Sequence, residues 1–494
     1  MGADDAELAR VREVATRGPY QPTWESLQRY TAPRWYADAK FGVFTHWGVY
    51  SVPAFGNEWY ARNMYRRGTP EFEHHVATYG PHTEFGYKDF VDRFTAPRFD
   101  PAAWVATFHR AGAQFVVPVA EHHDGFAMYA TARSEWNSVA RGPGRDVVGE
   151  LGDAVRAAGM VLGASSHRAE HWWFMNGGRE FDSDVRDPAH AAFYGPALRE
   201  ETAPNEQFLE DWLLRTVELV DRYRPQVLWF DWWIETPAFE PYLKLFAAYY
   251  YNEAARWGRE VVINYKWNAF ADGSAVYDVE RGALHGIHPR VWQNDTSVGR
   301  TSWSWVPDQR YKSVPELVAE LVDVVAKNGV LLLNVGPKAD GTLAPEEVEI
   351  LHGIGDWLTV HGEAVYGTRP WTVPGEGPTH LAAGSFVDST ARDHTGADVR
   401  FTVREDPSGT HLYATALGPV TDGVLRVRSW GSGAGLLGEF DDLRVLGHAG
   451  PVTSRRTAEA LEVDVPADRV GTSGVVVRVT RREPVPPPRH DGLH

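Results

Sequence analysis

The 494-residue sequence predicts an α/β protein in which a (β/α)8-like TIM barrel is followed by a C-terminal all-β sandwich. Up to about residue 365, short apolar runs alternate with helical patterns, which is typical of a parallel sheet. About eight such units fit a barrel with insertions better than a doubly wound sheet. No GxGxxG turn follows the first predicted strand, which also argues against a dinucleotide-binding sheet. From about Trp371, short alternating segments separated by turn residues replace this pattern.

The elements of the barrel follow from local periodicity, since short apolar runs predict buried strands and one-sided apolar patterns predict helices. The predicted strands are 41–45, 114–119, 160–164, 227–230, 261–264, 291–292 and 330–335. The predicted helices are 101–111, 145–158, 206–223, 239–257, 314–327 and 345–360. Later strands are predicted at 400–404, 411–416, 424–429 and 474–479. The expected domains are therefore a barrel at 1–368, a β-sandwich at 369–482 and a Pro-rich, disordered tail at 483–494.

Composition excludes several classes of function. The formal net charge of −17 argues against a nucleic acid or an anionic membrane as partner. The chain has no cysteine, which excludes disulfides, thiolate metal sites and cysteine nucleophiles. The N-terminal segment 1–18 is polar and unlike a signal peptide, so a cytoplasmic location is expected unless a leader was removed. Twenty tryptophans could stack on sugar rings or simply fill a core.

Ionisable and aromatic residues occur together at the ends of several predicted strands. In a barrel of this kind, the carboxyl ends of the strands carry the catalytic groups. A single polar strand end is usually the start of a loop, but repeated pairs are hard to explain as scaffolding. The ends concerned are Thr45–Gly48, Glu121–Asp124, Ser165–Arg168 with Glu170–Trp173, Phe230–Trp233, Asn264–Trp267 and Trp292–Asp295.

Asp231 follows the wholly apolar run 227–230 and precedes two tryptophans, which predicts a partly desolvated carboxylate at the barrel mouth. Such a group can act as a nucleophile or general base, and a helix N-cap is the alternative. Glycoside hydrolysis would need a second carboxyl group, about 5–5.5 Å away in a retaining enzyme. The candidates are Glu58, Glu121, Glu235, Asp278 and Glu280.

The histidines of these strand ends, together with His171, could hold a metal ion or a sugar. Imidazole nitrogens are suitable ligands for a metal. Adjacent histidines on an extended segment point to opposite faces, so His122 and His123 could chelate one ion only if the backbone bends. Neutral imidazoles also donate and accept hydrogen bonds with sugar hydroxyls. We favour sugar binding and predict neither a metal nor another cofactor.

Specific motifs extend from Trp35 to about Trp371, over nearly the whole predicted barrel. They are Ala39–Gly48 with Tyr50–Pro53, Glu58–Tyr60, Glu121–Phe126 with Trp136-Asn137, Arg145–Leu151, Leu331–Pro337 with Asp340–Thr342, and Gly362–Trp371. Together they resemble the α-L-fucosidases of glycoside hydrolase family 29. The resemblance implies a barrel followed by a β-sandwich and cofactor-free, retaining exo-hydrolysis of terminal α-L-fucosides. The implied substrates are fucosylated oligosaccharides or small fucosides, and a homo-oligomer remains open.

The resemblance also implies roles for individual residues. Asp231 falls where the family has its nucleophile, and Glu280 best fits the acid/base, with Asp278 and Glu58 as alternatives. Lys266 occupies a place where some members carry arginine, and lysine cannot make the same bidentate contact. The segment His167–Trp172 resembles only one branch of the family. Implied substrate contacts are His46, Glu58, Trp59, His122, His123, His167 and Lys266, with Phe44 and Trp303 against the C6 methyl group of fucose.

Three other functions remain open. A shallow or polar methyl pocket would favour a related α-L-glycosidase that acts on α-L-galactosides. A non-catalytic fucose-binding protein is a second possibility, against which the presence of both Asp231 and Glu280 argues. A metal-dependent hydrolase is a third, and chelation would inactivate it.

For the C-terminal domain we favour a stabilising appendage over a carbohydrate-binding module or a wall of the active site.

Overall fold

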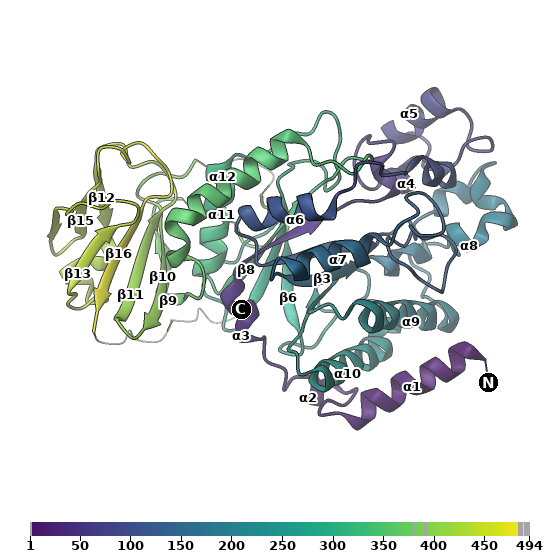
Figure 1. Ribbon diagram of the computed structural model, residues 1–494, viewed down its shortest axis with the longest axis horizontal. Helices are drawn as coiled ribbons and strands as arrows, with labels where there is room; N and C mark the ends of the chain where they lie inside the picture. The colour runs from purple at the N-terminus through teal and green to yellow at the C-terminus, as the bar shows by residue number, and fades with distance from the viewer. Residues whose placement is uncertain (1, 380–381, 389–392, 483–487, 489–494) are drawn as a thin grey trace.

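The computed structural model describes residues 2–379, 382–388, 393–482 and 488 (Figure 1). Eight parallel strands close into a barrel in which each strand pairs with the next along the chain and β8 pairs with β1. This confirms the predicted barrel. The strands are β1 (Phe41–Thr45), β2 (Phe115–Glu121), β3 (Val161–Ser166), β4 (Val227–Phe230), β5 (Val262–Tyr265), β6 (Val276–Glu280), β7 (Trp292–Ser297) and β8 (Gly329–Val335).

Long helices surround the barrel, and polar caps define where several of them begin. The side chains of Asp100, Asn205 and Ser313 each accept a hydrogen bond from a backbone N–H of the first helical turn. Such caps satisfy donors that have no partner inside the helix. The helices are α6 (Pro101–Arg110), α7 (Val147–Ala157), α9 (Glu206–Tyr223), α10 (Glu240–Trp257), α11 (Val314–Ala326) and α12 (Pro345–His361).

Shorter helices lie outside the predicted pattern. They are α2 (Trp24–Leu27), α3 (Arg34–Ala39), α4 (Tyr60–Asn63), α5 (Pro70–Tyr79) and α8 (Ala191–Tyr194). The N-terminal helix α1 (Ala3–Arg17) was also not predicted. It packs against α10, where Arg10 donates a hydrogen bond to the Tyr249 hydroxyl at 2.7 Å. Among the described residues, no helix is both long and apolar enough to cross a bilayer.

Two barrel strands differ from the prediction for the same physical reason. β6 was missed, and β7 continues to Ser297 instead of ending at Trp292. Both strands bury polar side chains inside the barrel, where Gln293 donates a hydrogen bond to Asp278 at 2.8 Å. A search for apolar runs cannot detect such strands, because here hydrogen bonding between side chains replaces apolar contact.

The C-terminal region forms two antiparallel sheets, which confirms the predicted all-β sandwich. One sheet has the order β13-β16-β11-β10-β9 and the other β12-β15-β14. Trp371, Phe401 and Trp430 are fully buried in their shared core. The strands are β9 (Arg369–Glu376), β10 (Val399–Asp406), β11 (Gly409–Ala416), β12 (Val424–Val427), β13 (Asp442–Val445), β14 (Ser454–Arg456), β15 (Leu461–Asp464) and β16 (Val476–Arg481). Of the tail predicted at 483–494, all but Pro488 lies outside the described residues.

The sandwich lies at one end of the long axis, beside α11 and α12 (Figure 1). Asp323 on α11 accepts a hydrogen bond from Arg400 Nε on β10 at 2.5 Å and another from Lys327 at 2.7 Å. Burial raises the pKa of Asp323, but these two cations outweigh it and hold that pKa below its ordinary value. The Asp323–Arg400 contact is a buried ion pair that joins helix α11 of the barrel to strand β10 of the sandwich.

Candidate active site

A cavity of about 440 Å³ opens at the carboxyl ends of the barrel strands. All of the predicted site residues except Phe44 and His167 line it, although they come from segments far apart in the sequence. The lining residues are His46, Asn57, Glu58, Trp59, His122, His123, Trp229, Asp231, Trp232, Lys266, Trp267, Glu280, Asp295, Trp303 and Phe386. The closed barrel therefore assembles the strand-end groups into one site.

Lys266 lies between the two carboxylates of greatest interest. Its Nζ is 3.0 Å from Asp231 Oδ1 and 2.5 Å from Glu280 Oε2. These two oxygens can therefore lie no farther apart than the sum of the two distances. That limit reaches the upper end of the separation of about 5–5.5 Å found in retaining glycosidases and lies below the about 6.5–9.5 Å of inverting ones.

The surroundings separate the pKa values of the two carboxyl groups. Burial raises the pKa of Asp231, but Lys266 and a hydrogen bond from His167 outweigh it and bring that pKa well below its ordinary value. Burial also raises the pKa of Glu280, and there the raised value persists despite Lys266, because Asp231 and Asp278 add negative charge. Asp231 is thus kept ionised, and Glu280 keeps its proton to a higher pH than an ordinary glutamate does. A pair of carboxyl groups whose pKa values are pushed apart in this way is suited to one ionised and one proton-donating role.

His167 and Phe44 lie directly behind the cavity wall. His167 Nδ1 donates a hydrogen bond to Asp231 Oδ2 at 2.8 Å, while its Nε2 is 3.0 Å from Ser165 Oγ. Phe44 is fully buried, and its ring lies 4.5 Å from that of His46 and 5.1 Å from that of Trp229, centroid to centroid. Both residues support groups that line the cavity.

Asp278 and Glu58, the alternatives for the acid/base, occupy other environments. Asp278 lies deeper in the barrel, where it accepts hydrogen bonds from Trp229 Nε1 at 3.0 Å and Gln293 Nε2 at 2.8 Å. It does not line the cavity. Glu58 does line it and accepts a hydrogen bond from the Trp303 backbone N–H at 2.9 Å. Glu280 is the candidate that shares Lys266 with Asp231.

The other two candidates for a second carboxyl group stand apart from the cavity. Glu121 is buried in ion pairs with Arg168 at 2.9 Å and Arg215 at 3.4 Å. Burial raises the pKa of Glu235, but this residue does not line the cavity either. Glu121 therefore ties strand β2 to the neighbouring elements through its ion pairs with the two arginines.

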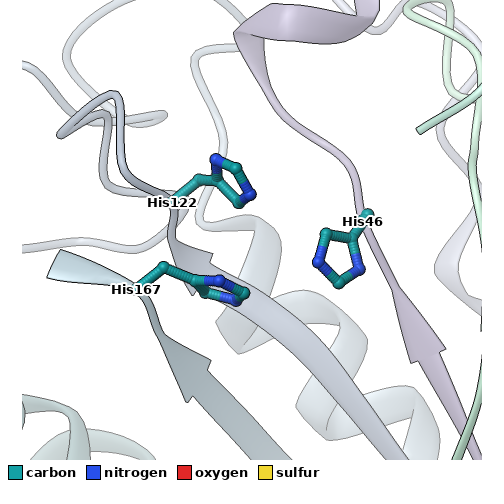
Figure 2. Close-up of side chains that lie close together, drawn as sticks. All are labelled: His46, His122 and His167. Atoms are coloured by element: carbon teal, nitrogen blue, oxygen red, sulfur yellow. The ribbon is translucent and has the colours of Figure 1, made fainter. Parts of the chain in front are cut away.

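Three histidines from consecutive strand ends converge at the base of the site. Figure 2 shows His46, His122 and His167 grouped around a common space. One nitrogen atom from each ring lies within 4.8 Å of the others. Burial lowers the pKa of His46 and His122 well below the ordinary value, so both are neutral at pH 7. The His46 Nδ1–H is held by Asn334 Oδ1 at 2.8 Å, which leaves Nε2 as a hydrogen-bond acceptor.

The backbone turns after β2, so His122 and His123 both face the cavity. The alternation expected for an extended segment therefore does not apply here. A second group that could hold a metal ion consists of His123, His167 and Asp231. The Lys266 ammonium, 3.0 Å from Asp231, would repel a cation bound there. His171 belongs to neither group. Its Nδ1 forms a hydrogen bond with the His123 carbonyl at 2.8 Å.

Several lining residues were not assigned a role from the sequence. Trp267 and Asp295 stood at predicted strand ends without a function, and Trp229 lay inside an apolar run. Phe386 was not recognised as a site residue, because it lies outside every predicted strand, in the connection between β9 and β10. Because Phe386 belongs to the region 369–482 and lines the cavity, that region contributes to the wall of the site.

Comparison with known proteins agrees with this geometry. Residues 7–363 match the model of the Alpha-L-fucosidase family. Tissue α-L-fucosidase of Rattus norvegicus is 34% identical over 364 residues, covering 72% of this chain and 74% of the relative. The Homo sapiens tissue enzyme is 34% identical over 373 residues, covering 74% and 76% respectively. The Thermotoga maritima α-fucosidase in complex with fucose is 31% identical, with a TM-score of 0.74 over 93% of this chain and 100% of that one.

The family match spans the whole barrel, and the solved relative also aligns over the sandwich, so the resemblance seen in the sequence motifs is confirmed. The chain belongs to the α-L-fucosidase family and is a glycoside hydrolase.

Proposed function

We propose that this protein is a retaining, exo-acting α-L-fucosidase that removes terminal α-L-fucosyl residues from glycans or small fucosides. The observation that carries the proposal is the contact of Lys266 with both Asp231 and Glu280, at 3.0 Å and 2.5 Å. This contact places the two carboxylates close together and keeps the first one ionised. Both conditions are required for a double displacement at the anomeric carbon.

In the first step Asp231 attacks the anomeric carbon while Glu280 gives its proton to the glycosidic oxygen. The bond from the anomeric carbon to that oxygen breaks, and a covalent fucosyl-enzyme and a free alcohol result. In the second step Glu280, now ionised, takes a proton from water as the water oxygen attacks the anomeric carbon. The ester bond to Asp231 breaks and releases fucose with its original α configuration.

The cavity supports recognition of one terminal sugar. Side chains fill the barrel below it, as in other barrels of this class, so a sugar that enters cannot pass through. Neutral His46 and His122 and the carboxylate of Glu58 supply hydrogen-bond partners for hydroxyl groups. Trp303 supplies an apolar face, suited to the methyl group that fucose carries in place of a hydroxymethyl group.

The direct test compares release of 4-nitrophenol from its α-L-fucoside and its α-L-galactoside. We expect the fucoside to be the better substrate by about 10- to 200-fold in kcat/KM, the range available to an apolar pocket that discriminates by one small group. Trp303→Ala should narrow this ratio. Preference for the galactoside would support the related glycosidase. Absence of turnover, combined with fucose binding by the folded protein, would support a binding protein instead.

A metal chelator is expected to leave this activity unchanged. The proposed steps need only protein carboxyl groups, and the neutral histidines serve as partners for sugar hydroxyls. Activity on the 4-nitrophenyl fucoside should be measured after dialysis against EDTA, with dialysis against buffer alone as the control. Loss of activity that added Zn²⁺ restores would instead assign the three histidines of Figure 2 to a metal.

Lys266→Met is expected to lower kcat/KM by about 10²-fold, the scale for loss of one buried electrostatic contact in an active site. Without the ammonium group the pKa values of both Asp231 and Glu280 rise, because each loses its nearest positive charge. The acidic and alkaline limbs of the kcat/KM profile should therefore both move to higher pH. Lys266→Arg keeps the charge and is the matched control. Unshifted limbs in Lys266→Met would contradict the assignment.

A further inference from the structure

The mouth of the cavity carries two exposed aromatic side chains that the proposed reaction does not use. Trp267 is 49% exposed and Phe386 is 57% exposed. Among the described residues, these are the aromatic members of the exposed large hydrophobic side chains, and both line the cavity. Exposed apolar surface gathered at the rim of a pocket is typical of a binding site.

Both residues have an uncommon backbone conformation. φ is 55° at Trp267 and 59° at Phe386, in the left-handed region that bulky residues rarely adopt. Neighbouring structure must impose this conformation, since it costs free energy, and such positions concentrate at ligand-binding sites. The two rings are therefore placed at the mouth by the fold.

Phe386 belongs to a short segment, residues 382–388, which we call the strap. The strap pairs with the chain that follows β6. Ala283 and Gly384 exchange two backbone hydrogen bonds, at 3.2 Å and 2.9 Å. Phe386 N–H donates to the Glu280 carbonyl at 2.9 Å, and Val387 N–H donates to the Arg281 carbonyl at 2.9 Å. This pairing sets Phe386 directly beside the proposed acid/base.

A buried ionic contact anchors the end of the strap. The side chain of Asp388 is 9% exposed and accepts hydrogen bonds from Thr296 Oγ1 at 2.7 Å and Lys312 Nζ at 2.5 Å. Arg281 Nη1 lies 3.5 Å from the same carboxylate. Because Asp388 is paired with two cations and a hydroxyl group, the strap is held before any substrate arrives.

The position of the rings relative to the chemistry identifies what they meet. Glu280 protonates the leaving oxygen, so the leaving group lies on the side of the cavity where Glu280 and the strap are found. Trp267 lines the same cavity and directly follows Lys266, the residue that contacts Glu280. The nearby carboxylates of Glu280 and Asp231 and the net charge of −17 disfavour an anionic leaving group. A neutral sugar ring, which has an apolar C–H face, is the leaving group that fits this side of the cavity.

We propose that Trp267 and Phe386 form a leaving-group subsite that binds a neutral pyranose through its C–H face. This inference rests on the proposed fucosidase function. It assigns the natural substrate to fucosides whose next residue is a neutral sugar, and it gives the C-terminal region a direct part in substrate choice.

The test compares a substrate whose leaving group is a pyranose with a substrate whose leaving group has no ring. The substrate with a pyranose leaving group is a neutral fucosyl disaccharide. It is chosen as the best substrate from a panel in which galactose or N-acetylglucosamine is the leaving group. The other substrate is α-L-fucosyl fluoride. Trp267→Ala and Phe386→Ala should each lower kcat/KM for the disaccharide by about three- to tenfold, the scale of one aromatic contact. Activity on the fluoride should stay within about twofold of wild type, which also shows that each variant folds.

Matched controls separate stacking from general damage. Trp267→Phe and Phe386→Tyr keep a ring and should keep most of the preference for the disaccharide. Val360→Ala shortens an exposed apolar side chain that does not line the cavity and should change neither substrate. Asp388→Ala releases the strap and should lower the disaccharide rate as Phe386→Ala does, while the fluoride is still hydrolysed.

An equal loss on both substrates, or no loss on the disaccharide, would overturn the subsite. An unchanged preference in Asp388→Ala would overturn the role of the strap in placing Phe386. If wild type hydrolysed neither substrate, the fucosidase proposal itself would fail. Hydrolysis of the fluoride by every variant, with an unchanged ratio between the two substrates, would reject the subsite alone.

Discussion

Asp231→Ala is expected to lower kcat for an α-L-fucoside by about 10⁴-fold or more, the scale on which loss of a catalytic nucleophile acts in other hydrolases. The side chain that Lys266 and His167 hold ionised is the group that would form the covalent bond. Alanine leaves a space at the anomeric carbon and no acceptor for the fucosyl group. Steady-state release of 4-nitrophenol from its α-L-fucoside measures the loss.

Sodium azide should restore turnover in Asp231→Ala, because the small anion can occupy the space left by the carboxylate. Its attack on the α-fucoside inverts the anomeric carbon, so the expected product is β-fucosyl azide, identified by NMR. Asp231→Asn, which fills the space, is the control and should respond less to azide. Rescue that yields α-fucosyl azide, or full activity in Asp231→Ala, would assign the nucleophile to another residue.

Glu280→Ala is expected to lower kcat/KM by about 10²- to 10⁴-fold for substrates whose leaving group must be protonated. The loss should be smaller for the 4-nitrophenyl fucoside, because nitrophenolate leaves without much help. With this activated substrate the fucosyl-enzyme can still form, and azide then attacks it from the α face. The expected product is α-fucosyl azide, opposite in configuration to the product from Asp231→Ala.

The rival acid/base residues give matched controls for Glu280. Asp278→Asn keeps the shape of the side chain that accepts hydrogen bonds from Trp229 and Gln293. Its loss of rate, if any, should be independent of the leaving group. A strong leaving-group dependence in Asp278→Asn or in Glu58→Gln, with none in Glu280→Ala, would move the acid/base role to that residue.

The pH dependence of kcat/KM provides a second readout for Glu280. The pKa of Asp231 is lowered, so activity should be lost only as pH falls through a value well below that of an ordinary aspartate. The pKa of Glu280 is raised, so activity should decline as pH rises through a value above that of an ordinary glutamate. Glu280→Gln should remove the alkaline limb and keep the acidic limb.

The barrel could be predicted because most of its strands are apolar on both faces. Strands β1 and β4 and helix α9 have the residue limits that periodicity gave, since buried parallel strands and amphipathic helices leave strong patterns. β6 was missed because its inward side chains are acidic. Of the two acidic residues that hid this strand, Glu280 lines the cavity and Asp278 lies deeper in the barrel.

The sequence by itself determined the fold class, through periodicity, and the family, through local motifs. It also determined the residue types of the site, because a charged residue beside an aromatic one at the end of a strand can be recognised locally. Tertiary structure alone decided which carboxyl groups lie close together. The contact of Lys266 with Asp231 and Glu280, and the pairing of the strap with the chain after β6, join segments distant in sequence. Distances and desolvation depend on how the barrel closes, and these two quantities determine pKa values and catalytic roles.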